Sequence, residues 1–133
     1  MTDHTDSEGP TAHAVELFRP IGINELALIK DTHYRAFPPR LPEQPIFYPV
    51  TNFEYAEQIA RDWNSKDPQH DNVGYVTRFR VRRSFLDAYD THTVGGSIHT
   101  EYWIPAHELD AFNVNLLSPI QVIAEYRHGT RVD

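Results

Sequence analysis

The sequence predicts one α+β domain in which a mostly antiparallel sheet is accompanied by two main helices. Its 133 residues suit a single domain, and 40% of them are hydrophobic, as in ordinary globular proteins. Two amphipathic helical segments come early, and most strand-like segments come late with connections too short for regular βαβ crossovers. We expect residues 14–127 to form the domain, with a disordered tail at 1–13 and a flexible C-terminus at 128–133.

The first third of the domain predicts a strand, a helix and a stiff loop. Apolar and polar residues alternate over 15–19, which predicts a strand that Pro20 ends. Asn24 is a candidate N-cap for a short amphipathic helix over 25–30. Four prolines follow within residues 38–45. They predict an extended loop, because proline fits neither a helix interior nor a central strand.

The clearest helix comes next, from residue 53 to about residue 64, after a strand over 46–50. Thr51 and Asn52 are both candidate caps for it. Its apolar residues fall at helical spacing and predict one stripe packed in the core: Phe53, Ala56, Ile59, Ala60 and Trp63. A polar loop over 65–72 then separates this helix from the sheet.

Most of the predicted sheet lies in the second half of the chain. Strict alternation predicts the best strand over 73–83, with Arg78, Arg80 and Arg82 on one face. We interpret that arginine face as solvated or paired with carboxylates, with phosphate binding as the alternative. Further strands are predicted at 97–104 and 119–126, separated by short helical segments or turns around 85–89 and 106–112.

Composition excludes several classes of function. The chain has no cysteine, so it has no disulfide, thiol nucleophile or thiolate zinc site. A net charge of -7, with two lysines and ten arginines, argues against generic binding to nucleic acid. No apolar run is long enough to span a membrane and no signal peptide is visible, so we expect a cytoplasmic protein without a membrane partner.

We expect no metal site either. His99-Thr100-Glu101 matches the first half of a zinc deaminase signature, but the paired cysteines that complete it are absent. His107-Glu108 begins a zincin-like motif, yet Ala111 stands where the second histidine is required.

Three features remain that could carry chemistry. Arg19 ends the first strand, Tyr48 precedes the main helix, and Glu101 lies among aromatic residues of a late strand. By strand alternation Glu101 shares a face with His99 and Trp103, which favours a solvent-facing carboxylate. The alternative is that Glu101 projects into the floor of a cleft. Arg19 is likewise either a surface arginine or a ligand-binding group.

The order of these features resembles the ADP-ribosyltransferase superfamily, a small split-sheet fold that binds NAD. Residues 17–20 are similar to the family's first strand with its Arg or His. Residues 47–51, followed by Tyr55-Ala56 and Ile59-Ala60, are similar to its Ser-Thr or Tyr strand and aromatic-alanine helix. Residues 99–105 are similar to the later strand with its Glu. The chain also resembles small bacterial proteins with Phe-Pro-Pro-Arg-Leu and Ala-Arg-Asp-Trp-Asn segments.

The resemblance implies an ADP-ribosyltransferase-like fold and NAD as the substrate. It assigns Glu101 to stabilise the oxocarbenium that forms when the nicotinamide–ribose bond breaks. Tyr48 would stack on the nicotinamide ring, and Arg19 would hold a phosphate or ribose.

The same resemblance implies supporting roles for three further residues. Thr51 would orient Glu101 by a hydrogen bond, and Arg40 in the proline-rich loop would flank the nucleotide. His99 is placed among the NAD-binding residues, where many members have Glu or Gln before the catalytic Glu. That difference argues against transfer to a protein arginine.

Three hypotheses of function follow. The first is an NAD-dependent ADP-ribosyltransferase-like enzyme whose acceptor the sequence leaves open, or an NAD glycohydrolase if the acceptor is water. The second is a non-catalytic nucleotide- or protein-binding module, such as an acidic partner-binding or immunity-type protein, whose charge suits a basic partner. The third is an unrelated small α+β protein. An enzyme of the first kind should place Arg19, Tyr48 and Glu101 around one pocket.

Overall fold

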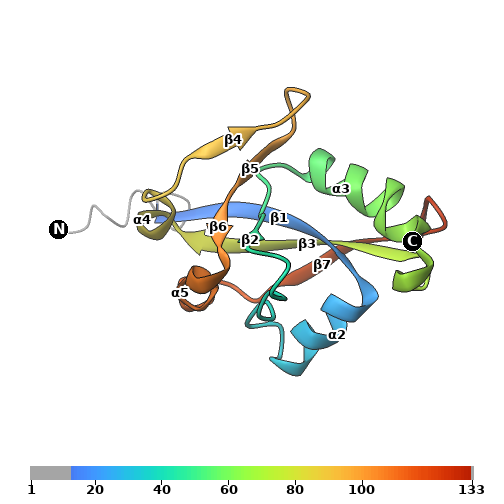
Figure 1. Ribbon diagram of the computed structural model, residues 1–133, viewed down its shortest axis with the longest axis horizontal. Coiled ribbons are helices and arrows are strands. Elements are labelled where there is room, and N and C mark those ends of the chain that lie inside the picture. Colours follow the sequence, from blue (N-terminus) through green and yellow to red (C-terminus); the bar gives the residue numbers. More distant parts are fainter. Residues whose placement is uncertain (1–12, 133) are drawn as a thin grey trace.

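The computed structural model describes residues 13–132 and has the predicted α+β architecture (Figure 1). The disordered tail expected at 1–13 lies outside the described residues except for His13. One antiparallel sheet of four strands has the order β1-β3-β7-β8. These strands are β1 (Ala14–Gly22), β3 (Val73–Arg82), β7 (Gln121–Arg127) and β8 (Thr130–Val132).

Shorter elements pack around this sheet. Two antiparallel pairs are formed by β2 (Ile46–Phe47) with β6 (Ile104–Pro105) and by β4 (Thr91–Thr93) with β5 (Thr100–Tyr102). The described helices are α2 (Ile23–Asp31), α3 (Phe53–Asp62), α4 (Arg83–Leu86) and α5 (Leu109–Val114). Single 3₁₀ turns cover Asn64–Lys66, Pro68–His70 and Ala106–Glu108.

The four-stranded sheet is covered on both faces. One face packs Leu17, Ile21 and Phe79 against α2, α5 and the β2–β6 pair. The other face packs Val76 and Tyr126 against α3. Because alternate residues of a strand point to opposite faces, β3 contributes to both layers.

Helix α3 lies unusually close to the sheet because its contact residues are small. Ala56 and Ala60 are fully buried, and a Cβ at Gly74 of β3 would lie 2.4 Å from the Ala60 carbonyl oxygen. Asn52 caps the helix by accepting a hydrogen bond from the Tyr55 N–H at 2.8 Å. The prediction that Trp63 belongs to the buried stripe is wrong. The helix ends at Asp62 and the chain turns away, which leaves Trp63 73% exposed and buries Ser65 instead.

Two predicted strand ends differ from the structure. β1 continues through Pro20 to Gly22, because Pro20 sits on an edge strand. The N–H and C=O of Phe18, two residues earlier, form hydrogen bonds with Val50 and so point away from β3. The nitrogen of Pro20 faces the same way, because alternate residues of a strand share one orientation. At the other end, the predicted flexible C-terminus instead forms a hairpin in which β8 pairs with β7.

Other boundaries are corrected by local geometry. α2 begins at Ile23 after Gly22, so Asn24 lies inside the helix and is not its cap. Only Ile46–Phe47 of the predicted 46–50 strand pairs regularly, as β2. The predicted 97–104 strand is divided between β5 and β6, with Trp103 between them.

Candidate functional site

Val50 connects the large sheet to β5 and determines where the candidate residues lie. Its backbone exchanges two hydrogen bonds with Phe18 on the open edge of β1, at 2.8 and 2.9 Å. On its other side Val50 stands opposite Glu101 in a second antiparallel bridge. Opposed residues of antiparallel strands point to one face, so Glu101 points toward the layer of Val50 and α3. Arg19, the residue after Phe18, lines the same cavity as Glu101.

The carboxylate of Glu101 is buried and held by two donors. Glu101 is 8% exposed; the Tyr55 hydroxyl donates to its Oε1 at 2.6 Å and the Trp103 Nε1–H donates to its Oε2 at 2.9 Å. Burial and the bond to Glu101 raise the pKa of Tyr55 well above its usual value, so the phenol keeps its proton. A carboxylate has about four acceptor positions, so both oxygens retain capacity for a ligand.

The donors to Glu101 are themselves positioned by ring contacts. The His92 ring stacks on Trp103 with centroids 3.7 Å apart and planes 9° apart. His99 packs on the Tyr55 ring at 4.6 Å. The His99 Nδ1 accepts the Gly96 N–H at 3.0 Å, so Nε2 carries the proton and donates to Gln58 at 2.7 Å.

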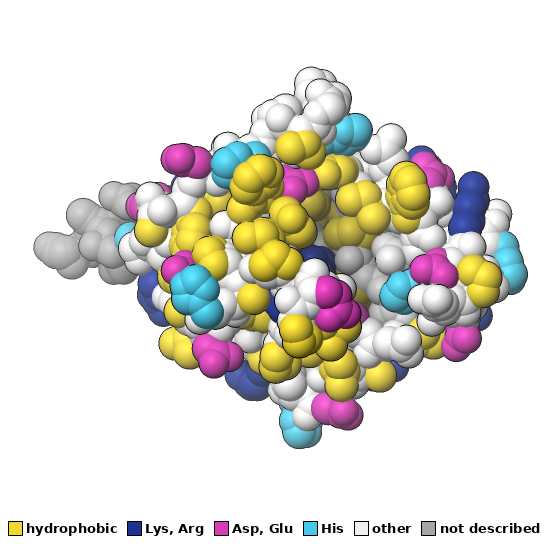
Figure 2. Space-filling model, viewed as in Figure 1, with side chains coloured by type: hydrophobic (Ala, Val, Ile, Leu, Met, Phe, Trp, Pro, Cys, Tyr) yellow, Lys and Arg dark blue, Asp and Glu magenta, His cyan; other side chains and the backbone are white. Residues whose placement is uncertain are grey.

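A cavity of about 280 Å³ opens beside this carboxylate. It is lined by Arg19, Pro20, Tyr48, Val50, Tyr55, Ile59, Asn64 and Glu101. The three residues that the sequence indicates as chemical candidates therefore meet around one pocket, which is the arrangement the enzyme hypothesis needs. On the face shown in Figure 2, hydrophobic side chains surround a recess near the middle in which basic atoms are visible.

The guanidinium of Arg19 already has an anionic partner. Arg19 is 8% exposed, and its Nε and Nη2 donate to the two carboxylate oxygens of Glu25 at 2.7 and 3.0 Å. Its Nη1 donates to the Tyr48 carbonyl at 3.5 Å, and its Cζ lies 4.5 Å from the Phe47 ring centroid. The fork that the resemblance assigns to a phosphate or ribose is thus engaged by α2, and a ligand anion would compete with Glu25.

Three residues predicted at the site do not line this cavity: Thr51, His99, and Arg40, which lines the adjoining cavity described below. Thr51 does not orient Glu101; its backbone N–H and its hydroxyl both donate to the Thr100 carbonyl, at 3.0 and 3.3 Å. His99 lies behind Tyr55 and contacts the site through that ring. The Thr51 hydroxyl is directed at the β5 backbone and the His99 ring at α3, so of Thr51, His99 and Glu101 only Glu101 lines the cavity.

A second cavity of about 430 Å³ adjoins the first and shares Arg19, Pro20 and Asn64 with it. It lies among the end of β1, α2, the proline-rich loop and the 3₁₀ turns that follow α3. Within residues 13–132, three buried side-chain polar atoms have no hydrogen-bond partner: Arg40 Nε, Asn64 Oδ1 and His70 Nδ1. All three residues line this second cavity.

Arg40 is held there by the root of its loop. The Asn113 side chain accepts the Phe37 N–H at 2.9 Å and donates to the Phe37 carbonyl at 3.0 Å, and the Phe37 ring is buried against Phe47 and Phe79. The Arg40 guanidinium lies 6.0 Å from the Phe47 ring centroid. Burial and the neighbouring Arg19 lower the pKa of Arg40 below its usual value.

Sequence reasoning missed several residues of these cavities. The sequence marks Tyr55 only as part of a helical pattern, and it carries no signal for Glu25, Asn64 or His70. The i, i+2 spacing of Trp103 from Glu101 was a usable signal, because such residues share a strand face. The others come from separate elements and meet only in three dimensions.

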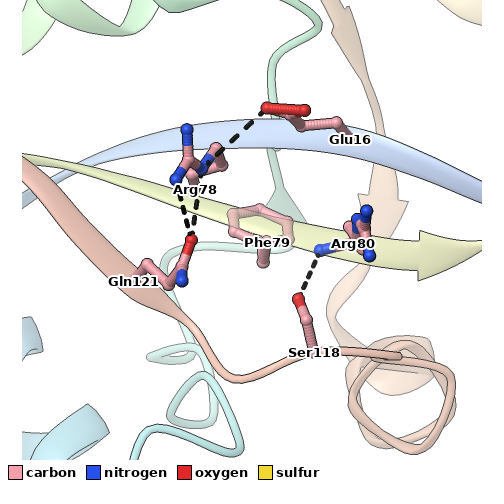
Figure 3. Close-up of a pocket in the computed structure, with 6 residues that line it drawn as sticks. All are labelled: Glu16, Arg78, Phe79, Arg80, Ser118 and Gln121. Carbon is pink, nitrogen blue, oxygen red and sulfur yellow. Dashed lines mark hydrogen bonds and ion pairs between the residues drawn. The ribbon is translucent and has the colours of Figure 1, made fainter.

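The arginine face of β3 forms a third hollow, a groove of about 320 Å³ (Figure 3). Its polar groups are largely engaged with each other. Arg78 donates to Gln121 at 3.0 and 3.2 Å and lies 3.9 Å from Glu16, while the Arg80 N–H donates to Ser118. This agrees with our interpretation of a paired, solvated surface.

Two further properties concern only the described part of the chain. Residues 13–132 contain no group of three or more His, Asp or Glu side chains placed to hold a metal ion. None of the helices in this range is long and apolar enough to cross a membrane.

Comparisons with known proteins found no matching family model, no similar curated protein and no similar solved structure. The function of the two adjoining cavities is therefore inferred from their geometry.

Proposed function

We propose that this chain is an ADP-ribosyltransferase-like protein that binds NAD and cleaves its nicotinamide–ribose bond beside Glu101. One observation carries the proposal: a buried carboxylate, fixed by Tyr55 and Trp103, shares a cavity with Arg19 and Tyr48. A fixed anion beside a cavity is suited to stabilise a cation that forms only in the transition state.

The proposed reaction balances without any further cofactor. The bond from the ribose carbon to nicotinamide breaks, and its electron pair stays on the ring nitrogen, which becomes neutral. The sugar gains oxocarbenium character, which Glu101 stabilises while it accepts a hydrogen bond from a ribose hydroxyl. Water or an acceptor nucleophile then adds to that carbon and loses its proton. Tyr48 is 41% exposed in the cavity lining, which leaves its ring able to contact the leaving nicotinamide.

The volume of the cavities bears on whether a dinucleotide fits. The cavity beside Glu101 measures about 280 Å³, below the range of about 300–1,000 Å³ for ordinary ligand sites. The adjoining cavity adds about 430 Å³. A dinucleotide held with its nicotinamide ribose at Glu101 would therefore have to extend into the second cavity.

The test is calorimetric titration with NAD, with nicotinamide release assayed in the same samples. Glu101→Gln should keep NAD binding and lose release by about 10²–10³-fold, as for other groups that stabilise transition-state charge. Glu108→Gln is a matched control, because Glu108 also accepts a tyrosine hydroxyl, from Tyr89, but does not line the cavity. Full release by Glu101→Gln would exclude this mechanism.

A second candidate is a non-catalytic nucleotide- or protein-binding module of the same fold. The Arg19–Glu25 pair favours it, because it engages the guanidinium that the resemblance gives to the ligand. In the same titration, NAD binding without nicotinamide release would favour this module. If NAD is neither bound nor cleaved, a basic protein becomes the partner to test.

A further inference from the structure

The second cavity concentrates polar groups that the fold leaves without partners. More than about 90% of buried polar groups in proteins are hydrogen-bonded, and each exception costs stability. Here Arg40 Nε, Asn64 Oδ1 and His70 Nδ1 are such exceptions, and all three residues line one cavity. They come from the proline-rich loop and from two successive turns, so no single strained segment explains them.

The charges around this cavity favour an anion. Arg19 and Glu25, which also line it, neutralise each other through two hydrogen bonds. Arg40 forms no hydrogen bond or ion pair among residues 13–132, so its positive charge is left over. His70 adds a second donor in the tautomer that carries the ring proton on Nδ1, which has no partner in the fold, and its Nε2 lies 3.6 Å from Asp67.

The donor groups of the site also suit an oxyanion. A guanidinium presents several donors in a planar fork that matches phosphate oxygens. The Asn64 amide can present either its oxygen or its nitrogen by rotation. A Cβ at Gly22 would lie 1.9 Å from His70 Nδ1, so the imidazole packs beside the end of β1 only because Gly22 has no side chain.

We propose that the cavity lined by Arg40, Asn64 and His70 is an oxyanion subsite that takes a phosphate or diphosphate group. The inference rests on the proposed function only where it names the molecule that supplies the oxyanion. That molecule is a dinucleotide whose nicotinamide ribose lies at Glu101 and whose diphosphate enters this cavity. Free phosphate or diphosphate shares the same chemistry and is the other source.

The experiment titrates the full chain with inorganic pyrophosphate, with NAD and with nicotinamide riboside, which lacks the diphosphate. Arg40→Gln should weaken pyrophosphate and NAD by a similar factor of about 10–100 and leave nicotinamide riboside unchanged. His70→Gln should weaken the same two ligands. Arg80→Gln is the control, because it removes the same charge from the exposed groove of Figure 3.

Each outcome separates the subsite from the proposed function. Pyrophosphate binding that depends on Arg40, without any NAD binding, supports the subsite and overturns the dinucleotide. NAD binding with nicotinamide release that Arg40→Gln leaves unchanged overturns the subsite and keeps the proposed function. Equal effects of Arg40→Gln and Arg80→Gln reduce the binding to general electrostatics and overturn the subsite. Binding of neither ligand overturns both.

Discussion

The two adjoining cavities differ in how their polar groups are partnered. Beside Glu101 the chemical groups are fixed within the fold: both carboxylate oxygens have donors, and Arg19 has a carboxylate. Beside Arg40 the guanidinium, an amide oxygen and an imidazole nitrogen have none. The first cavity is thus organised before any ligand arrives, while the second is completed only by one. Fixed groups suit transition-state stabilisation, and unpartnered groups suit ground-state binding.

The largest expected effect comes from removing the carboxylate that pairs with Arg19. Glu25→Ala leaves the Arg19 guanidinium buried without its carboxylate, so the free energy of unfolding should fall by about 3 kcal/mol. Urea unfolding measures it. Glu16→Ala is the control, because the Glu16–Arg78 pair is half-exposed at 3.9 Å and should cost less than about 1 kcal/mol. Equal losses in the two variants would show that the Arg19–Glu25 pair is no stronger than a surface pair.

A smaller effect is expected from one donor of the fixed carboxylate. Tyr55→Phe removes the hydroxyl from Glu101 and should lower the free energy of unfolding by about 1.5 kcal/mol, as for hydrogen bonds to charged groups. Tyr89→Phe removes the equivalent bond to Glu108 outside the cavity. Nicotinamide release should fall only in Tyr55→Phe. An equal decrease in both variants would mean that the hydroxyl supports folding and not the site.

The contrast between the cavities also marks what the sequence can predict. The α+β class, the α3 segment with its Asn52 cap and the long strand β3 follow from local periodicity and capping, and they are confirmed. The buried position of Glu101 was the disfavoured alternative. Strand alternation assumes one continuous strand. In the structure the strand is interrupted at Trp103, and Glu101 pairs with Val50 in an isolated bridge.

The second cavity could not be predicted, for a related reason. Arg40 was chosen only through its place in the proline-rich loop, and His70 and Asn64 had no signal at all. Their common property is the lack of a partner, and that property exists only after the loop is rooted by Phe37 and Asn113. Pairing is a tertiary property, so periodicity and spacing carry no information about it.

A third prediction concerns the hydrogen bond from Tyr89 to Glu108, which lies outside the cavity and should be lost at alkaline pH. Burial and the bond to Glu108 raise the pKa of Tyr89 to about 12, above its value of about 10 in an unfolded chain. Its contribution is therefore complete below about pH 10 and is lost as the pH rises from about 10 to 12. The difference in unfolding free energy between wild type and Tyr89→Phe should be constant up to about pH 10 and narrow above it. A constant difference at all pH values would contradict the shift.

The smallest effect is expected at the unpaired cation, where the contrast between the cavities is sharpest. Arg40→Gln removes a charge that has no partner in the fold, so the unfolding free energy of the free protein should not fall and should rise by at most about 1 kcal/mol. Pyrophosphate at about 100 times its Kd should stabilise the wild type by about 2.7 kcal/mol and the variant by much less. A large loss in the free variant would mean that Arg40 supports the loop and not a ligand. It would also remove the difference between the two cavities, since both cations would then belong to the fold.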